Sequence, residues 1–353
     1  MLESDFPAAV PHGGNLGDAV RRYGIRREDW IDLSTGINPH GYPVPAIDAN
    51  AWLRLPDDDD DLETVAAQHY GAPRTLATAG TQAAIRMLPE VLPAGRIGIG
   101  LLTYGEYAPA FARGGFGVER FVTARFSDMR ERAAFVLEPG RALPASLKHL
   151  VLVNPNNPGA EAFSPEAVMD WHRQLVTRGG TLVVDEAFVE AMPQFSVASR
   201  SGDEGLIVLR SVGKFFGLAG ARVGFVLACA RADRAMRHLR GPWTVSGPAR
   251  IAVRAALLDA AWQEQTRLRL LASSARLVRV LGECGFDAHA TPLFSWVREA
   301  RAPQWQDYLA RRGVWVRQFE TVTGLRFGLP AEESAWERVE TALRYARSEM
   351  DGR

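Results

Sequence analysis

The chain has 353 residues, of which 47% are hydrophobic and 23% charged, and its 41 basic side chains balance 41 acidic ones. This length gives room for two packed lobes with a large core, and a formal net charge of zero excludes a general electrostatic attraction to nucleic acid or to an anionic membrane. Two cysteines, Cys229 and Cys284, are too few for a disulfide framework or a four-thiolate metal site, so we expect a cytoplasmic protein. The N-terminus has no basic segment followed by an apolar stretch, and we expect no membrane-spanning segment.

Residues 60–230 alternate helical patterns with short runs rich in valine, isoleucine and leucine, which predicts a mostly parallel sheet in a doubly wound α/β lobe. Helices are expected over residues 81–91 and 165–177. The expected strands cover residues 75–78, 96–100, 149–153, 181–184, 206–210 and 222–227. Five consecutive aspartates at 57–61 suit a divalent metal, but we favour a solvated run that assists the start of the next helix.

A second, smaller α+β lobe is expected after Arg240. Glycine and proline at 241–248 predict a joint, and the following pattern predicts one long helix over residues 249–283. Short strands at 293–297, 314–317 and 325–328 and a terminal helix from Ala331 complete this lobe. The predicted domains are therefore an arm over 1–45 that contributes to the small lobe and the substrate site, a large domain over 46–240, and a small C-terminal domain over 241–353.

Ligands of an open α/β sheet bind beyond the carboxyl ends of its strands, so polar residues after each apolar run are the candidate site. Gly80-Thr81-Gln82 begins a helix whose free N–H groups suit a phosphate, although Gly-Thr is also simply a good helix start. Two Asn-Pro steps follow the buried run at 149–153, in Asn154-Pro155-Asn156-Asn157-Pro158-Gly159. This loop either directs an asparagine amide at one ligand oxygen or is an ordinary Asn-Pro turn.

A carboxylate and a lysine follow the next two strands. Asp185 ends a buried run, where it either caps a loop or faces a cation. Lys214 stands in the glycine-rich segment Ser211–Arg222, where loss of water would make its amine nucleophilic, and Arg222 adds a charge suited to phosphate. Together these are the groups that a protein needs to bind pyridoxal 5′-phosphate (PLP).

On these motifs the sequence resembles the fold-type I PLP enzymes of the aspartate aminotransferase superfamily over nearly its whole length. The resemblance implies that Lys214 bonds the cofactor and moves a proton, that Asp185 pairs with the pyridine nitrogen, and that Asn157 donates to the ring oxygen. It places Tyr104 on the cofactor ring, although a tyrosine here is otherwise a half-buried loop residue. The phosphate would be held by Gly80, Thr81, Gln82, Ser211 and Arg222.

Two positions depart from the pattern of these aminotransferases. Phe188 stands where they have a tyrosine that donates to the ring oxygen, so Asn157 must act without it. Leu55 stands where histidinol-phosphate aminotransferases have a tyrosine that reaches the cofactor phosphate across the dimer.

The N-terminal region is similar to the threonine-phosphate decarboxylases of cobalamin biosynthesis, in His12-Gly13-Gly14-Asn15 and in Asp-Leu-Ser-Thr-Gly-Ile-Asn-Pro at 32–39. This resemblance implies that His12 and Asn15 bind a substrate phosphate, with Asn38 also on the substrate side, and that Arg326 binds a carboxylate. Arg317 is either a second anion contact or a solvent-facing residue at a strand end.

The implied reaction is the decarboxylation of L-threonine O-3-phosphate to 1-amino-2-propanol O-2-phosphate by a homodimer, with no metal, nucleic acid or membrane involved. Asp185 would keep the pyridine nitrogen protonated so that the ring accepts electrons. An aminotransferase acting on histidinol phosphate or an aromatic amino acid would use the same cofactor residues. A non-catalytic protein on this scaffold is disfavoured, because it would not need Lys214, Asp185 and Asn157 together.

Overall fold

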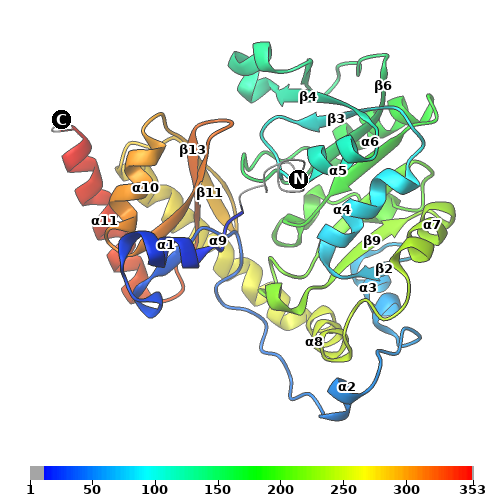
Figure 1. Cartoon of the computed structure of the whole chain (residues 1–353), viewed down its shortest axis with the longest axis horizontal. Coiled ribbons are helices and arrows are strands. Elements are labelled where there is room, and N and C mark those ends of the chain that lie inside the picture. The colour runs from blue at the N-terminus through cyan, green and yellow to red at the C-terminus, as the bar shows by residue number, and fades with distance from the viewer. Residues whose placement is uncertain (1–11, 352–353) are drawn as a thin grey trace, which may run out of the picture.

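The structure is a computed structural model that describes residues 12–351. The described chain forms two lobes, each built on its own sheet, and the helix α9 (Ala260–Glu283) runs from one lobe into the other (Figure 1). Within residues 12–351, no helix combines the length and the apolar character needed to cross a bilayer.

The sheet of the large lobe has eight strands in the order β2-β9-β8-β7-β6-β3-β4-β5. Only β9 runs against its neighbours, so the expected mostly parallel sheet is confirmed. Two strands of this sheet, β4 and β5, were not expected. The eight strands are β2 Leu76–Thr78, β3 Arg96–Gly100, β4 Gly117–Thr123, β5 Phe135–Leu137, β6 Leu147–Val153, β7 Thr181–Asp185, β8 Leu206–Ser211 and β9 Gly224–Ala228.

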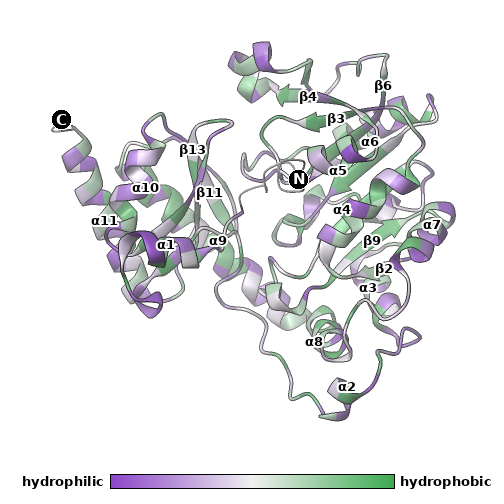
Figure 2. Ribbon diagram, viewed as in Figure 1, coloured by the Kyte–Doolittle hydropathy of each residue, from purple (hydrophilic) through white to green (hydrophobic). Residues whose placement is uncertain are grey.

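Side chains of the central strands alternate between two apolar layers, as the two-residue period of a strand requires. Val151 and Val183 pack with α4, α5 and α7, whereas Leu150 and Leu182 pack in a second layer that includes α6. Figure 2 shows these strands as hydrophobic ribbons inside the lobe. The helices of this lobe are α2 Asn50–Leu53, α3 Leu62–Tyr70, α4 Gly80–Val91, α5 Tyr107–Arg113, α6 Pro165–Val176 and α7 Ala230–Arg240.

The sheet of the small lobe has five strands in the order β1-β12-β13-β11-β10. Strand β1 pairs in parallel with β12, which joins the N-terminal arm to the C-terminal lobe. The strands are β1 Ile31–Leu33, β10 Ala288–Thr291, β11 Phe294–Arg298, β12 Val314–Phe319 and β13 Gly324–Gly328, and the accompanying helices are α1 Leu16–Tyr23, α10 Ala302–Ala310 and α11 Glu333–Asp351.

The expected single helix over residues 249–283 is two helices, α8 Gly247–Leu258 and α9, which meet at Asp259. The Asp259 carboxylate accepts a hydrogen bond from the backbone N–H of Trp262 at 2.9 Å and so caps α9. A short polar side chain that competes for backbone donors ends one helix and begins the next. The predicted domain limit at 240 stays a prediction, although α8 beyond it packs on α3 of the large lobe.

The aspartate run is not simply solvated, and in this the prediction was wrong. Arg250 of α8, whose side chain is 2% exposed, donates from Nε to Asp60 at 2.7 Å and from Nη1 to Asp58 at 3.2 Å. The expected help to the next helix is present, because Asp60 accepts from the N–H of Leu62 at 3.0 Å. The run therefore ties the start of α3 to α8, since a buried guanidinium requires paired acceptors.

Candidate active site

A cavity of about 130 Å³ opens beyond the carboxyl ends of the large-lobe strands. Strands β7 and β8, the Asn157 loop and the start of α4 supply its walls, which is where an open α/β sheet binds ligands. The structure brings together at this cavity all nine residues that the sequence suggested for the cofactor: Gly80, Thr81, Gln82, Tyr104, Asn157, Asp185, Ser211, Lys214 and Arg222.

Lys214 lies in the loop after β8, and Asn38 of the N-terminal arm is hydrogen-bonded to the backbone of this loop. The backbone N–H of Asn38 donates to the Lys214 carbonyl at 3.0 Å, and the Asn38 amide donates to the Phe215 carbonyl at 2.9 Å. Removal of the ammonium from water, and then the nearby Arg326 charge, lower the pKa of Lys214 to about 8. A minority of the amine, far more than for an exposed lysine, is therefore neutral near physiological pH, and the neutral amine is the nucleophile.

Asp185 lies at the end of β7 and is 4% exposed. The hydroxyl of Tyr107, from α5, donates to one carboxylate oxygen at 2.7 Å, and the N–H of Ala187 donates to the other at 3.0 Å. Burial raises the pKa of Asp185, and these two donors oppose the rise. The carboxylate is thus fixed at the floor of the cavity, where it can pair with a protonated ring nitrogen.

The lining of the cavity also includes the donor groups of a phosphate site. Gly80 begins α4 with φ +73°, and a Cβ at this position would lie 2.8 Å from the guanidinium of Arg222. The positive φ favours glycine at this position, and the near contact is with the flexible end of the Arg222 side chain. Gly80 and Thr81 at the N-terminus of α4, Ser211 and Arg222 all line this cavity, and Gly80 lies beside the Arg222 guanidinium. This donor set, together with Lys214 and Asp185, fits PLP.

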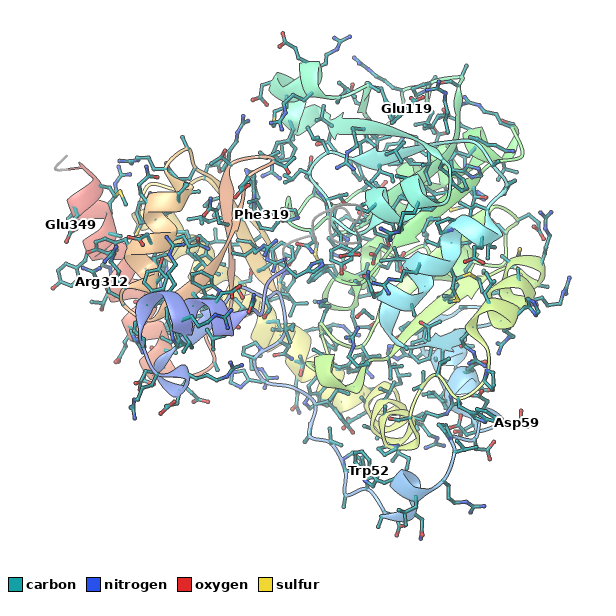
Figure 3. The ribbon with its side chains drawn as sticks, in the orientation of Figure 1. Trp52, Asp59, Glu119, Arg312, Phe319 and Glu349 are labelled. Atoms are coloured by element: carbon teal, nitrogen blue, oxygen red, sulfur yellow. The ribbon has the colours of Figure 1, made fainter. Side chains whose placement is uncertain are left out.

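A second cavity adjoins the first and contains the predicted anion-binding residues. His12, Arg317 and Arg326 line it together with Lys214, Tyr104 and Asn157. Arg317 and Arg326 are directly opposite each other on β12 and β13. Figure 3 labels Phe319, which also lines this cavity, on the side of the small lobe that faces the large one.

Arg326 is the buried member of this pair, at 7% exposure. Its Nη1 donates to the Asn157 side-chain oxygen at 2.5 Å and its Nη2 to the Ser34 carbonyl at 2.6 Å. Burial, and then the charge of Arg317, lower the pKa of Arg326. An anion beside the two guanidinium groups would relieve this repulsion. Because Arg326 occupies the Asn157 oxygen, the amide NH₂ of Asn157 is left to donate toward the cofactor cavity.

Two of the predicted substrate residues lie elsewhere. Asn38 is 3% exposed and lines neither cavity, because its side chain donates to the Phe215 carbonyl and accepts from the N–H of His40. Asn38 therefore holds the backbone of the Lys214 loop and does not line the substrate cavity. Asn15 is exposed, donates to Asp18 and lines an outer hollow that shares His12 and Arg317 with the second cavity.

The two departures from the aminotransferase pattern have different settings. Phe188 lines the cofactor cavity, and its ring packs edge-on against Phe294 at 5.0 Å, so an apolar ring occupies the place of a hydroxyl donor. Leu55 is 69% exposed beyond α2, close in sequence to the exposed Trp52 and Leu53. Leu55 does not line the cofactor cavity of its own chain, and its side chain has no hydrogen-bonding group.

A buried ionic cluster, which was not expected from the sequence, lies next to Asp185 and Lys214 in the chain. It links the residues after β7 to β8. Arg210, the residue before Ser211, donates to Glu186 at 2.7 Å and to Glu190 at 2.5 Å. His69 lies 2.8 Å from Glu190. Burial opposes ionisation of Glu190, but Arg210 and His69 together outweigh it and the pKa of Glu190 falls to about 2. The cluster therefore joins the turn after β7 to the end of β8 through charges that would be costly to leave unpaired.

Tyr107 and Glu106 were also missed. Both belong to the segment after Tyr104, and the spacing of two tyrosines three residues apart was the one signal for Tyr107. Nothing local in the sequence shows that this hydroxyl meets a carboxylate 78 residues away.

Comparison with known proteins identifies the family. The model of the family described as aminotransferase class I and II matches residues 28–342. The chain belongs to the class I and II aminotransferase family.

Within this family, two relatives match nearly the full chain. A protein of Pseudomonas aeruginosa named threonine-phosphate decarboxylase is 47% identical and matches 95% of this chain and 97% of its own. A protein of Sinorhizobium sp with the same name is 38% identical, over 97% and 99%. The solved structure of histidinol-phosphate aminotransferase from Sinorhizobium meliloti in complex with pyridoxal-5′-phosphate superposes with a TM-score of 0.72 at 18% identity, covering 98% of this chain and 96% of that one. The fold-type I architecture expected from the sequence is therefore confirmed.

Proposed function

We propose that this protein is a PLP-dependent decarboxylase that converts L-threonine O-3-phosphate to 1-amino-2-propanol O-2-phosphate and CO₂ in cobalamin biosynthesis. The observation that carries the proposal is the pair of opposed arginines, Arg317 and Arg326, in the cavity that contains Lys214. Threonine phosphate has two anionic groups, a carboxylate and a phosphate. Histidinol phosphate has a phosphate but no carboxylate, so it would leave one of the cationic positions without a partner.

The roles of the residues follow from their positions. Arg222, Ser211, Thr81 and the N-terminus of α4 would hold the cofactor phosphate, and Asp185 would keep the ring nitrogen protonated. PLP bound at Lys214 supplies an electron sink for the pair left behind when CO₂ departs. Lys214 then has the position and the lowered pKa to return a proton to the substrate α-carbon.

The anion sites would decide which bond at the α-carbon breaks. Arg326 is fixed by Asn157 and Ser34, so it offers a rigid guanidinium for the carboxylate. His12 and Arg317 lie on the outer side of the same cavity and would take the phosphate. Two separate anchors hold the substrate in one orientation, as stereoelectronic control of the broken bond requires.

We further propose that the enzyme is a homodimer. The apolar side chains of Trp52 and Leu53 on α2 are 68% and 80% exposed, and Leu55 follows them. A cluster of large exposed apolar side chains on one short segment is typical of a protein interface. The cytoplasmic location remains a prediction from the sequence.

Product analysis tests the proposed reaction. The holoenzyme is incubated with L-threonine O-3-phosphate alone, and CO₂, the amine phosphate and any keto acid are quantified. We expect CO₂ and amine in equal amounts without keto acid, and free threonine should be a far poorer substrate because it leaves the phosphate site empty. Faster turnover of histidinol phosphate with 2-oxoglutarate would instead assign an aminotransferase.

A further inference from the structure

A chain of side-chain hydrogen bonds joins the N-terminal segment to the cofactor cavity, with Glu106 at its centre. His12 Nε2 lies 2.6 Å from Glu106 Oε1, and Gln82 Nε2 donates to Glu106 Oε2 at 2.7 Å. The Tyr104 hydroxyl donates to Gln82 Oε1 at 3.0 Å. Glu106 lines neither cavity, but His12 lines the substrate cavity, Gln82 the cofactor cavity and Tyr104 both.

The carboxylate fixes the direction of every bond in this chain. An ionised carboxylate only accepts hydrogen bonds, so His12 Nε2 must carry a proton and Gln82 must turn its NH₂ group toward Glu106. The Gln82 oxygen is then left for the Tyr104 hydroxyl. With its proton on Nε2, a neutral imidazole can only accept at Nδ1. Donation from Nδ1 to a substrate anion requires a second proton on the ring, and the Glu106 carboxylate places a negative charge beside that ring.

The backbone beside His12 is held as well, but by the other lobe. The N–H of Gly14 donates to the Ser34 hydroxyl at 2.8 Å, and a Cβ at Gly13 would lie 2.2 Å from the Ser34 carbonyl oxygen. Ser34 follows β1 of the small lobe, whereas Glu106 precedes α5 of the large lobe. The side chain of His12 is 47% exposed, so its contact with Glu106 removes rotamer freedom that a substrate would otherwise have to freeze.

We propose that Glu106 is a positioning residue for the substrate phosphate, which acts by holding the His12 ring through Nε2 at the wall of the substrate cavity. The inference rests on the proposed function, because it takes the phosphate of threonine phosphate as the anion that His12 binds. Glu106 also orders Tyr104 through Gln82, so the anion site and the wall of the cofactor cavity share one support.

The substitution Glu106→Gln tests the proposal in the holoenzyme. The amide keeps the size of the side chain but removes the charge and the fixed direction of the bonds. We expect the KM for threonine phosphate and the Kd for inorganic phosphate, measured by titration calorimetry, to rise about three- to tenfold, as for a partly exposed charged pair. The kcat should stay within about twofold, since the loss concerns binding of the anion rather than the bond-breaking step. An equal fall in kcat without a change in KM or Kd would overturn the proposal.

Glu119→Gln is a matched control. The Glu119 side chain is 14% exposed against 15% for Glu106, and it pairs with an exposed Arg96 at 2.9 Å. Figure 3 shows Glu119 at the outer edge of the large lobe, and Arg96 begins β3 at the end of the strand opposite the site. This variant should keep the parent KM, kcat and phosphate affinity, whereas a rise like that of Glu106→Gln would show a general effect of lost charge and overturn the proposal.

A double-mutant cycle with His12→Ala shows whether Glu106 acts through His12. If it does, adding Glu106→Gln to His12→Ala raises KM and Kd no further. Additive effects would overturn the proposal, because Glu106 would then act on the anion by another route. If His12→Ala itself changes neither KM nor Kd, the phosphate site of the proposed function falls. If His12→Ala raises both and Glu106→Gln raises neither, only the role of Glu106 falls.

Discussion

The hydroxyl of Tyr107 should stabilise the protein mainly through the charge of Asp185. Tyr107→Phe removes the 2.7 Å hydrogen bond from the tyrosine hydroxyl to the buried Asp185 carboxylate. One oxygen of that carboxylate then loses this donor. A hydrogen bond to a charged acceptor is worth about 2 kcal/mol. At roughly 2.1 cal/mol/K of unfolding entropy per residue, this loss lowers the melting temperature of a chain of this length by about 3 °C.

The pH dependence of this loss follows from the pKa of Asp185. Burial raises the pKa of Asp185 above 3.8, and Tyr107 opposes the rise, so the variant has a still higher pKa. A carboxyl whose folded pKa is raised costs stability as the pH increases from the unfolded pKa to the folded pKa, because the unfolded chain releases its proton first. The two proteins should therefore differ least in acid, where the carboxyl is protonated in both, and most at neutral pH.

Thermal unfolding of the cofactor-free proteins at several pH values measures this difference. Tyr23→Phe is the control, since Tyr23 donates to Asp307 at 2.9 Å at a partly exposed position of the small lobe. Its loss should stay below about 1 kcal/mol, because solvent screens the carboxylate. A Tyr107→Phe loss that is the same in acid and at neutral pH would refute the role of the Asp185 charge.

Three further outcomes are expected. Lys214→Ala should abolish the visible absorbance of the bound cofactor and leave turnover at background. In the parent the rate of cofactor attachment should rise with pH, with its midpoint at about 8, and level off once the amine is neutral. A continued rise toward pH 10 would contradict the burial argument. Asp185→Asn should fold yet lose about 10²-fold or more in turnover, as for loss of a charged partner at a reacting centre; near-normal turnover would make Asp185 a structural cap. Sedimentation should show a dimer that Leu53→Asp weakens, and an active monomer at assay concentration would refute this.

Most of the cofactor residues could be predicted from the sequence because they lie at or shortly after the end of a strand. Asp185 and Ser211 end β7 and β8, and Gly80 begins α4 two residues after β2. A parallel sheet brings such strand ends to one edge, so their order along the chain nearly determines their meeting in space. The strands themselves were visible as short runs of buried aliphatic residues.

Contacts that depend on tertiary distance could not be predicted in this way. The Glu106 carboxylate meets His12 across 94 positions of the chain, and Arg250 meets Asp60 across 190. Charged residues on a helix and in an acidic run are usually solvated, so the sequence pattern favoured solvent over a partner. The helix break at Asp259 is a different case, since an N-cap residue was present in the sequence but the long apolar period around it outweighed that signal.

The two cavities explain why cofactor and substrate are specified by different parts of the chain. The cofactor cavity is lined by residues of the large lobe, from Gly80 to Val223. The substrate cavity adds His12 from the N-terminal arm and Arg317 and Arg326 from β12 and β13 of the small lobe. The position of the small lobe therefore sets where the anions lie relative to Lys214. A family that keeps one cofactor site can change its reaction by changing these few cationic positions, because they decide which substrate bond stands across the ring.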